Sequence, residues 1–184
     1  MPEHYSTENQ FNRSVLWVLI GLGIIVNLLP IGSTIIEPDS ALYAVIAKTM
    51  VLKGDWVNLY VQGSDWLDKP HFPFWAAALS FKIFGIHSFA YRLPAIFFWL
   101  VGGWYTWKFA CLQYSQAVGQ LALLIYLTSL HLVISNNDVR AEPYLTGMLI
   151  AAVYHFALAG GLPRSTRRVP PDGWIGVFAG FTRR

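Results

Sequence analysis

Charged residues are scarce in this sequence of 184 residues: they make up 12% of it, against 55% hydrophobic residues. A soluble domain has about 25% charged residues, so the composition excludes an ordinary soluble globule and a disordered chain. The net charge is +3, and the excess of basic residues is concentrated in one part of the chain, which argues against a nucleic-acid partner. Cys111 is the single cysteine, so the chain has no intrachain disulfide. A mean hydropathy of +0.44 indicates a membrane protein.

Long runs without charge predict where the chain crosses the membrane. A helix needs about 20 apolar residues to cross the hydrocarbon core, and residues 14–36 carry no charge over 23 positions. Further charge-free runs favour spans at 117–135 and 143–161, and a span is also predicted at 93–112, where the only charge, Lys108, lies near the end and can snorkel to the interface. The sequence therefore predicts an all-α integral membrane protein, built as a multi-helix bundle with four spans. Residues 174–184 have the pattern of the start of another span, cut short.

Residues 72–85 form a fifth apolar run that is too short to cross. A helix of 14 residues extends only about 21 Å, and a lysine such as Lys82 costs about 2.5–3.5 kcal/mol at mid-bilayer. We therefore expect a helix that lies in the membrane interface. Its apolar stripe consists of Phe72, Trp75, Leu79 and Ile83.

A second interfacial helix is predicted at 40–52, where it would end at Lys53 and Gly54. Residues 37–92 then form one outer loop with interfacial helices. The apolar side chains expected to face the lipid are Leu42, Val45, Ile46 and Leu52.

Charge distribution favours this topology. The outer loop has five acidic and five basic residues, whereas Arg164, Arg167 and Arg168 cluster on the inner side. This arrangement obeys the positive-inside rule. If residues 72–85 crossed instead, the arginine cluster would lie outside, and residues 37–70 would be separated from 138–142.

Ionisable residues of the outer loop are candidates for a site. Asp39 directly precedes the predicted helix, so it is either the N-cap or a functional carboxylate near the mouth of the first span, and the two roles are compatible. Pro70 restricts Lys69 to extended geometry. Lys69 can then bind a phosphate as a point charge, or pair with Asp68. Arg92, at the outer end of the second span, either binds an anionic partner or snorkels.

A second acidic cluster is predicted where the third span returns to the outer face. Glu142 precedes Pro143, the expected first residue of the fourth span, and a carboxylate is favourable there. Arg140 can pair with Glu142, and Asp138 lies close in sequence. Ionisable groups that gather at a membrane boundary indicate a functional site by default.

Metal-ligand spacing is not seen among the histidines, so a metal site is left unassigned. His131 and His155 fall in predicted spans, where we expect hydrogen-bonded packing residues. The sequence also contains no phosphate-binding loop, dinucleotide fingerprint or nucleophile elbow.

Six short motifs occur in order between residues 38 and 146. They are PDSALYA (38–44), GDWV (54–57), WLDKP (66–70), ALSFKIFG (78–85), YRLP (91–94) and VRAEPYLT (139–146). In this order the chain resembles the N-terminal third of polyprenyl-phosphate-sugar glycosyltransferases of the GT-C class, relatives of lipid A aminoarabinose transferase and protein O-mannosyltransferase. Each motif is weak alone, whereas the ordered set is fairly specific.

The resemblance implies transfer of a sugar from a polyprenyl-phosphate donor to a lipid or protein hydroxyl, with inversion. It also implies a multi-pass protein of the cell inner membrane whose active face is periplasmic. Asp39 and Glu142 match the two acidic catalytic positions, and Lys69 and Arg92 match positions near the donor phosphate. The supporting residues are Asp68, Asp138 and Arg140. A divalent ion could assist departure of the phosphate, but the sequence shows no ligand set for one.

The sequence departs from this family at two positions of the first site and in length. Ser40 stands where the family often has Glu, and Leu42 stands where it commonly has Arg. The family usually runs to several hundred residues, so a truncated product is expected. The alternative is a non-catalytic membrane fragment or lipid-binding subunit, which would bind a polyprenyl phosphate without turnover. A transporter fits less well, because no charged residue lies well inside a predicted span.

Overall fold

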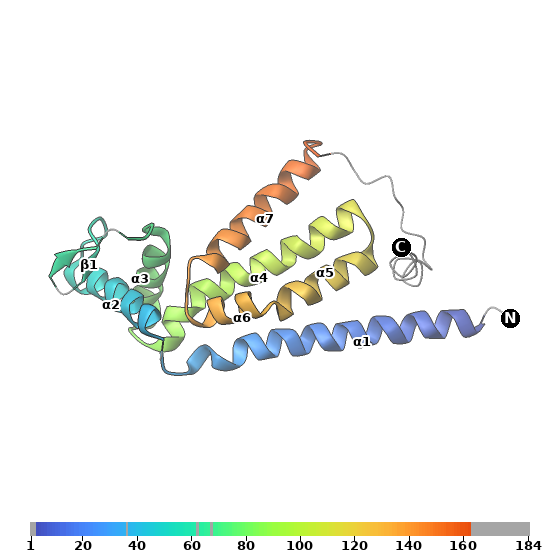
Figure 1. Cartoon of the computed structure of the whole chain (residues 1–184), viewed down its shortest axis with the longest axis horizontal. Coiled ribbons are helices and arrows are strands. Elements are labelled where there is room, and N and C mark those ends of the chain that lie inside the picture. Colours follow the sequence, from blue (N-terminus) through green and yellow to red (C-terminus); the bar gives the residue numbers. More distant parts are fainter. Residues whose placement is uncertain (1–2, 36, 62, 67, 163–184) are drawn as a thin grey trace, which may run out of the picture.

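The computed structural model describes residues 3–35, 37–61, 63–66 and 68–162, and most of these residues are helical, which confirms the all-α prediction. A two-residue antiparallel pair of strands interrupts the helices (Figure 1). The predicted arginine cluster at 164–168 and the predicted span start at 174–184 lie outside the described residues. The elements are α1 (Glu3–Leu28), the 3₁₀ turn η1 (Leu29–Gly32), α2 (Pro38–Lys53), β1 (Tyr60–Val61), β2 (Ser64–Asp65), α3 (Phe72–Phe84), α4 (Ser88–Gln113), α5 (Gln116–Thr128), α6 (Leu130–Asn137) and α7 (Glu142–Leu158).

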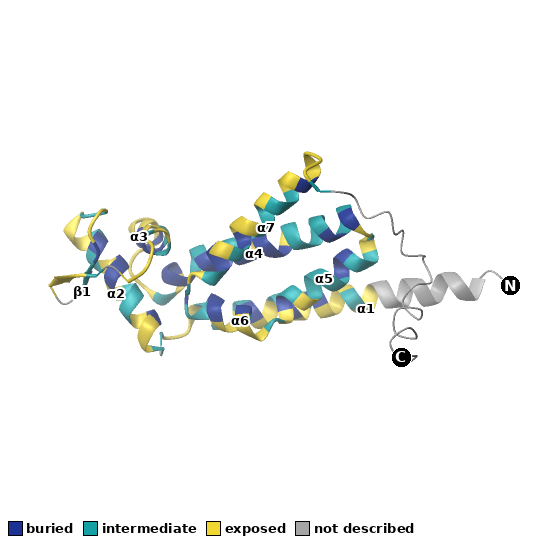
Figure 2. Ribbon diagram, turned by 45° about the horizontal axis from the view of Figure 1, so that its top comes forward, coloured by how far each residue is buried: buried dark blue, intermediate teal, exposed yellow. Residues whose placement is uncertain are grey.

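The longer helices form a bundle, and α2, α3 and the strands form a separate layer at one end of it (Figure 1). In the bundle α4 packs against α5 and α7, and α1 packs against α5. The residues coloured as buried lie mainly where helices adjoin one another, whereas many residues along the outside of the bundle are exposed (Figure 2). The core of the bundle consists of Ile20, Ile96, Trp99, Leu127 and Leu132.

Among the described helices, one is long and apolar enough to cross a membrane by itself. Ser14–Gly32 is long and apolar enough to cross a membrane, as predicted for 14–36. The helices α5 and α6 qualify only if they are counted as one span, because the chain bends by 53° between them. In the expected spans 93–112 and 143–161, α4 and α7 are helical, but neither qualifies by itself. The four-span topology therefore stays a prediction.

The layer of α2 and α3 has its own apolar core. α3 buries Phe74, Ala77, Ala78 and Phe81 against α2 and the start of α4. The predicted stripe lies on the opposite face, where the exposed fraction rises from 38% at Phe72 to 64% at its last member. The helix expected at 72–85 is therefore confirmed, and its apolar stripe is largely exposed, although the ring of Phe72 also contacts Phe98 and Tyr144.

The second predicted loop helix is also present, with one correction to its faces. α2 begins two residues before the predicted start and ends at Lys53; the next residue, Gly54, has a φ of 69°, in the left-handed region that favours glycine. Val45 and Leu52 are exposed as expected. Ile46 is fully buried, so its assignment to the lipid-facing side was wrong. Ile46 packs into the core that α2 shares with α3, so its side chain is not free to face the lipid.

Glycine allows α4 and α7 to approach closely, and this contact gives a first prediction. A Cβ at Gly147 would overlap the backbone oxygen of Phe98, so Gly147→Ala must push the two backbones apart. Overpacking of this kind costs about 1–3 kcal/mol. We expect a lower midpoint of thermal unfolding, followed by circular dichroism in detergent. The matched control is Gly21→Ala in α1, where a Cβ meets nothing within 4 Å. Equal midpoints for the two variants would contradict this packing.

Candidate functional site

The first turn of α2 brings an acidic residue to the surface near the end of the bundle. Glu37 is the N-cap, and its carboxylate accepts a hydrogen bond of 2.7 Å from the backbone N–H of Ser40. Pro38 occupies the first helical position, where its missing N–H costs nothing. The N-cap role considered for Asp39 was therefore wrong. Asp39 lies in the first turn with an exposed side chain, and forms no hydrogen bond or ion pair with the described residues.

Four of the predicted site residues line one pocket of about 130 Å³: Asp39, Lys69, Arg140 and Glu142. We call it the α2–α7 pocket. It lies between the N-terminal turn of α2, the segment before α3, and the loop that joins α6 to α7. Residues from three separate parts of the sequence thus meet at one place. The remaining lining residues are Tyr43, Pro70, Pro73, Phe74, Val139 and Ala141.

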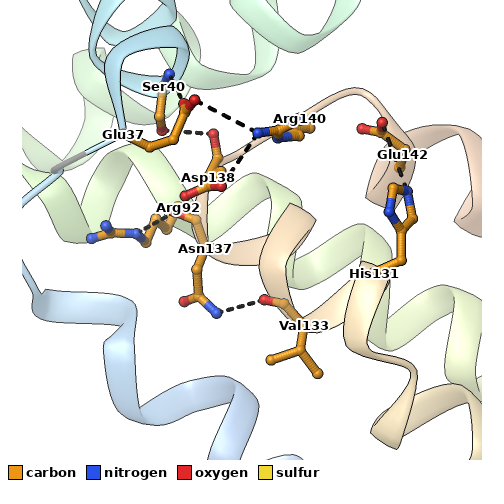
Figure 3. A network of polar contacts seen from close by, with 9 residues as sticks. All are labelled: Glu37, Ser40, Arg92, His131, Val133, Asn137, Asp138, Arg140 and Glu142. Carbon is orange, nitrogen blue, oxygen red and sulfur yellow. Dashed lines mark hydrogen bonds and ion pairs between the residues drawn. The ribbon is translucent and has the colours of Figure 1, made fainter.

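Arg140 links the two acidic clusters (Figure 3). Its guanidinium lies 3.6 Å from Glu37 Oε1 and 3.7 Å from Asp138 Oδ2. The pairing expected with Glu142 is therefore replaced by two other carboxylates. Within the described residues the Nε of Arg140 has no hydrogen-bond partner. Burial and the neighbouring Glu37 raise the pKa of Asp138 above its usual range, and Arg140 acts in the opposite direction.

Glu142, at the N-terminus of α7, lies close to a histidine of α6. The Nε2 atom of His131 lies 3.9 Å from Glu142 Oε1 (Figure 3). The His131 side chain is 69% exposed, so the expectation of a packing residue inside a span was wrong. In contrast, His155 forms the expected hydrogen bond, at 3.1 Å from the hydroxyl of Tyr105. Glu142 Oε2 is buried without a hydrogen-bond partner among the described residues.

Arg92 lies apart from the α2–α7 pocket and does not line it. The residue is 4% exposed. Its Nε donates to the backbone oxygen of Asn137 at 2.7 Å (Figure 3). The other guanidinium nitrogens donate to the backbone oxygens of Ile31, Ser33 and Thr34. Arg92 therefore joins the α1–α2 connection to the end of α6, and its donors are directed away from the pocket.

Lys69 and Asp68 are both exposed, but only Lys69 lines the pocket. No ion pair joins the two residues in the described structure, so the alternative considered for Lys69, pairing with Asp68, is not seen. The ammonium group of Lys69 is therefore available to a ligand in the pocket.

Several residues of the site were missed by the sequence reasoning. The hydroxyl of Ser40 donates to the backbone oxygen of Asp138 at 2.6 Å, which fixes α2 to the α6–α7 loop (Figure 3). Proline is common at the first helical position, so Pro38 indicates that the residue before it, Glu37, is the N-cap. That signal was available for Glu37. The contact of Ser40 with a loop 98 residues later has no sequence signal.

A protein-held metal ion finds little support in the described residues, which contain no group of three or more His, Cys, Asp or Glu side chains that could hold one. Some of the described carboxylates instead lie within 4 Å of Arg140 or His131, and Lys69 lines the same pocket as Arg140. The arrangement suits an anionic ligand on its cationic side and a hydroxyl group on its acidic side.

The fold and the site thus define an α-helical protein with a carboxylate- and cation-lined pocket near the end of a membrane-type helix. The chain belongs to the family described as dolichyl-phosphate-mannose-protein mannosyltransferase, whose family model matches residues 68–181.

Curated relatives agree with this family. The chain is 27% identical over 165 residues to the undecaprenyl phosphate-alpha-4-amino-4-deoxy-L-arabinose arabinosyl transferase 1 of Proteus mirabilis (strain HI4320), a match that covers 88% of this chain and 30% of the relative. The corresponding transferase of Yersinia pestis (strain Pestoides F) is 30% identical over 160 residues, covering 86% of this chain and 29% of the relative. The chain therefore spans about 30% of the length of these relatives. No solved structure matches it.

Proposed function

We propose that this chain forms the site of a membrane glycosyltransferase that moves a sugar from a polyprenyl-phosphate donor to a hydroxyl of a lipid or protein, with inversion. The names of the relatives support the donor class. The observation that carries the proposal is the α2–α7 pocket, which brings two carboxylates and two cations together.

In the proposed reaction Asp39 is the general base. Its carboxylate takes the proton of the acceptor hydroxyl while that oxygen attacks the anomeric carbon of the sugar. The bond between this carbon and the phosphate oxygen breaks, and the polyprenyl phosphate leaves with the bonding electrons. The exposed position of Asp39 in the pocket supports this role. A positioned base contributes about 10²–10⁴-fold to the rate.

The other pocket residues would bind the two substrates. Lys69 and Arg140 face the pocket and would stabilise the charge on the leaving phosphate. Glu142 would position the acceptor, with His131 beside it. Arg92 would act on phosphate binding only indirectly. Its guanidinium donates to backbone oxygens of Asn137 and Ser33, and in this way it holds the segments that lead into the pocket. Asp68 lies outside the pocket lining.

The proposal also places the pocket at the periplasmic face of a multi-pass protein of the inner membrane. Asp39 and Glu142 line one pocket, so both must lie on the same side of the membrane. The largely exposed apolar stripe of α3 supports a position along the lipid surface.

Binding of undecaprenyl phosphate by this chain in lipid nanodiscs tests the proposal. Loss of one hydrogen bond to a charged group costs about 1.5–3 kcal/mol, so we expect Lys69→Met to raise the Kd by about 10- to 100-fold. The matched control is Lys48→Met, which removes an exposed lysine of α2 that is not part of the pocket lining. The proposal fails if the unmodified chain does not bind, or if both variants bind equally well. Binding without sugar transfer by a full-length relative would support a lipid-binding role instead.

A further inference from the structure

One fully buried amide lies in the apolar helix α1. Asn27 has an exposed fraction of 0%, within the stretch Ser14–Gly32 that is apolar enough to cross a membrane. A polar side chain in such a position is costly unless its hydrogen bonds are made. Asn27 therefore needs partners on the helices beside it.

Those partners lie on both sides of the break between α5 and α6. Asn27 Nδ2 donates to the backbone oxygen of Leu127 at 2.9 Å and to that of Gly23 at 2.8 Å. Asn27 Oδ1 accepts a hydrogen bond of 3.1 Å from Asn136 Nδ2. Asn136 is also fully buried. One side chain of α1 thus contacts the last turn of α5 and the last turn of α6.

The break explains why an amide is needed there. α5 ends at Thr128 and α6 begins at Leu130, with a bend of 53° between them. Backbone oxygens in the last turn of a helix have no helical N–H four residues later from which to accept a hydrogen bond, so they need other donors. In an apolar surrounding water does not supply them. The amide of Asn27 supplies a donor to one such oxygen, that of Leu127.

The direction of α6 decides where the pocket loop lies. α6 ends at Asn137, and the next five residues include Arg140 and Glu142 of the α2–α7 pocket. The far end of α6 is held by Arg92, which binds the backbone oxygen of Asn137. Asn27 contacts the same end of this short helix through Asn136, and it also contacts the end of α5 before the break through the backbone oxygen of Leu127.

We infer that Asn27 is a positioning residue for the α2–α7 pocket: its amide stabilises the bend between α5 and α6, and this bend directs Arg140 and Glu142 toward Asp39 and Lys69. The consequence for sugar transfer rests on the proposed function, whereas the consequence for the geometry of α6 does not. The two can therefore be tested separately.

Thiol reactivity tests the geometry without any ligand. In a Cys111→Ser background, Ser135→Cys places a thiol at a position of α6 that is 1% exposed. A hydrogen bond between helices in a membrane contributes about 1–2 kcal/mol, so we expect Asn27→Leu to raise the maleimide labelling rate at position 135 by about tenfold. The control thiol is Ala157→Cys in α7, at a site that is 3% exposed. Labelling there should not change.

Three outcomes would overturn the inference. Unchanged labelling at position 135 would show that the amide does not hold α6. Equal increases at positions 135 and 157 would show a general loss of stability rather than positioning. Additive effects of Asn27→Leu and Asn136→Leu would show that the two amides do not act together, because contacting partners give non-additive effects.

Undecaprenyl phosphate binding then tests the link to the pocket. We expect Asn27→Leu to raise the Kd by about tenfold, as for the loss of about 1–2 kcal/mol of positioning. If the unmodified chain binds and Asn27→Leu binds equally well, the positioning role is wrong. If the unmodified chain does not bind, the proposed function fails, while the labelling experiment still decides the role of Asn27 in the fold.

Discussion

Replacement of Asp39 by asparagine is expected to lower sugar transfer by about 10²–10⁴-fold, because asparagine keeps the shape of the side chain but cannot accept the acceptor proton. Folding should change little. Asp39 is exposed and forms no hydrogen bond or ion pair with the described residues, so only its favourable place in the first turn of α2 is lost. That contribution is about 0.3–1 kcal/mol.

The measurement is transfer from an undecaprenyl-phosphate-linked sugar by a full-length relative that carries the equivalent change. Binding of undecaprenyl phosphate by this chain should stay within about twofold for Asp39→Asn, because the base acts on the acceptor and not on the phosphate. The matched control is Asp65→Asn, an exposed aspartate of β2 that is not among the pocket residues. Transfer at a normal rate with Asp39→Asn would remove the base assignment.

The parts of the fold that follow local rules could be predicted from the sequence. Helix α3 was predicted from its length and from the spacing of its apolar residues, and the structure has it at Phe72–Phe84. The charge pattern of the loops predicted that Asp39, Glu142 and the cations Lys69, Arg92 and Arg140 share one face of the membrane. In the structure all of them except Arg92 line one pocket, whereas the side of the membrane on which it lies stays a prediction.

The partners within the site could not be predicted in the same way. Arg92 looked like a phosphate ligand because a cation stood at the outer boundary of a span. Its real partners are backbone oxygens of η1, of the α1–α2 connection and of α6. Backbone groups are present at every position, so a sequence does not mark which of them lack a partner. The same reason hid the contact of Asn27 with Leu127.

Arg140 forms ion pairs with carboxylates other than the one that its sequence neighbourhood suggested. The sequence suggested Glu142, two residues away, whereas the structure pairs it with Glu37 and Asp138. Glu37 is distant in sequence and comes close where Ser40 binds the α6–α7 loop. Sequence proximity is therefore a poor guide to ion pairs in loops whose position is set by tertiary contacts.

Replacement of Arg92 by methionine should destabilise the protein more than Gly147→Ala or Asn27→Leu. Arg92 is 4% exposed, and its guanidinium donates to four backbone oxygens. Methionine fills similar space but leaves these oxygens without their donor. A lost hydrogen bond to a charged group costs about 1.5–3 kcal/mol, and several backbone oxygens lose their donor at once, so we expect a loss of about 3 kcal/mol in the free energy of unfolding.

Lysine at the same position should recover only about half of this loss, because a lysine is a point charge without the planar fork that reaches several oxygens at once. Unfolding of the chain by heat and by denaturant, in the same detergent, measures both variants. The control is Lys53→Met, which removes an exposed lysine 4.0 Å from the ring of Tyr60 and should cost about 0.5–1 kcal/mol. If Arg92→Met lowers the free energy of unfolding no more than this control does, the four hydrogen bonds contribute little to stability. The α1–α2 connection would then need another contact to hold Asp39 opposite Glu142.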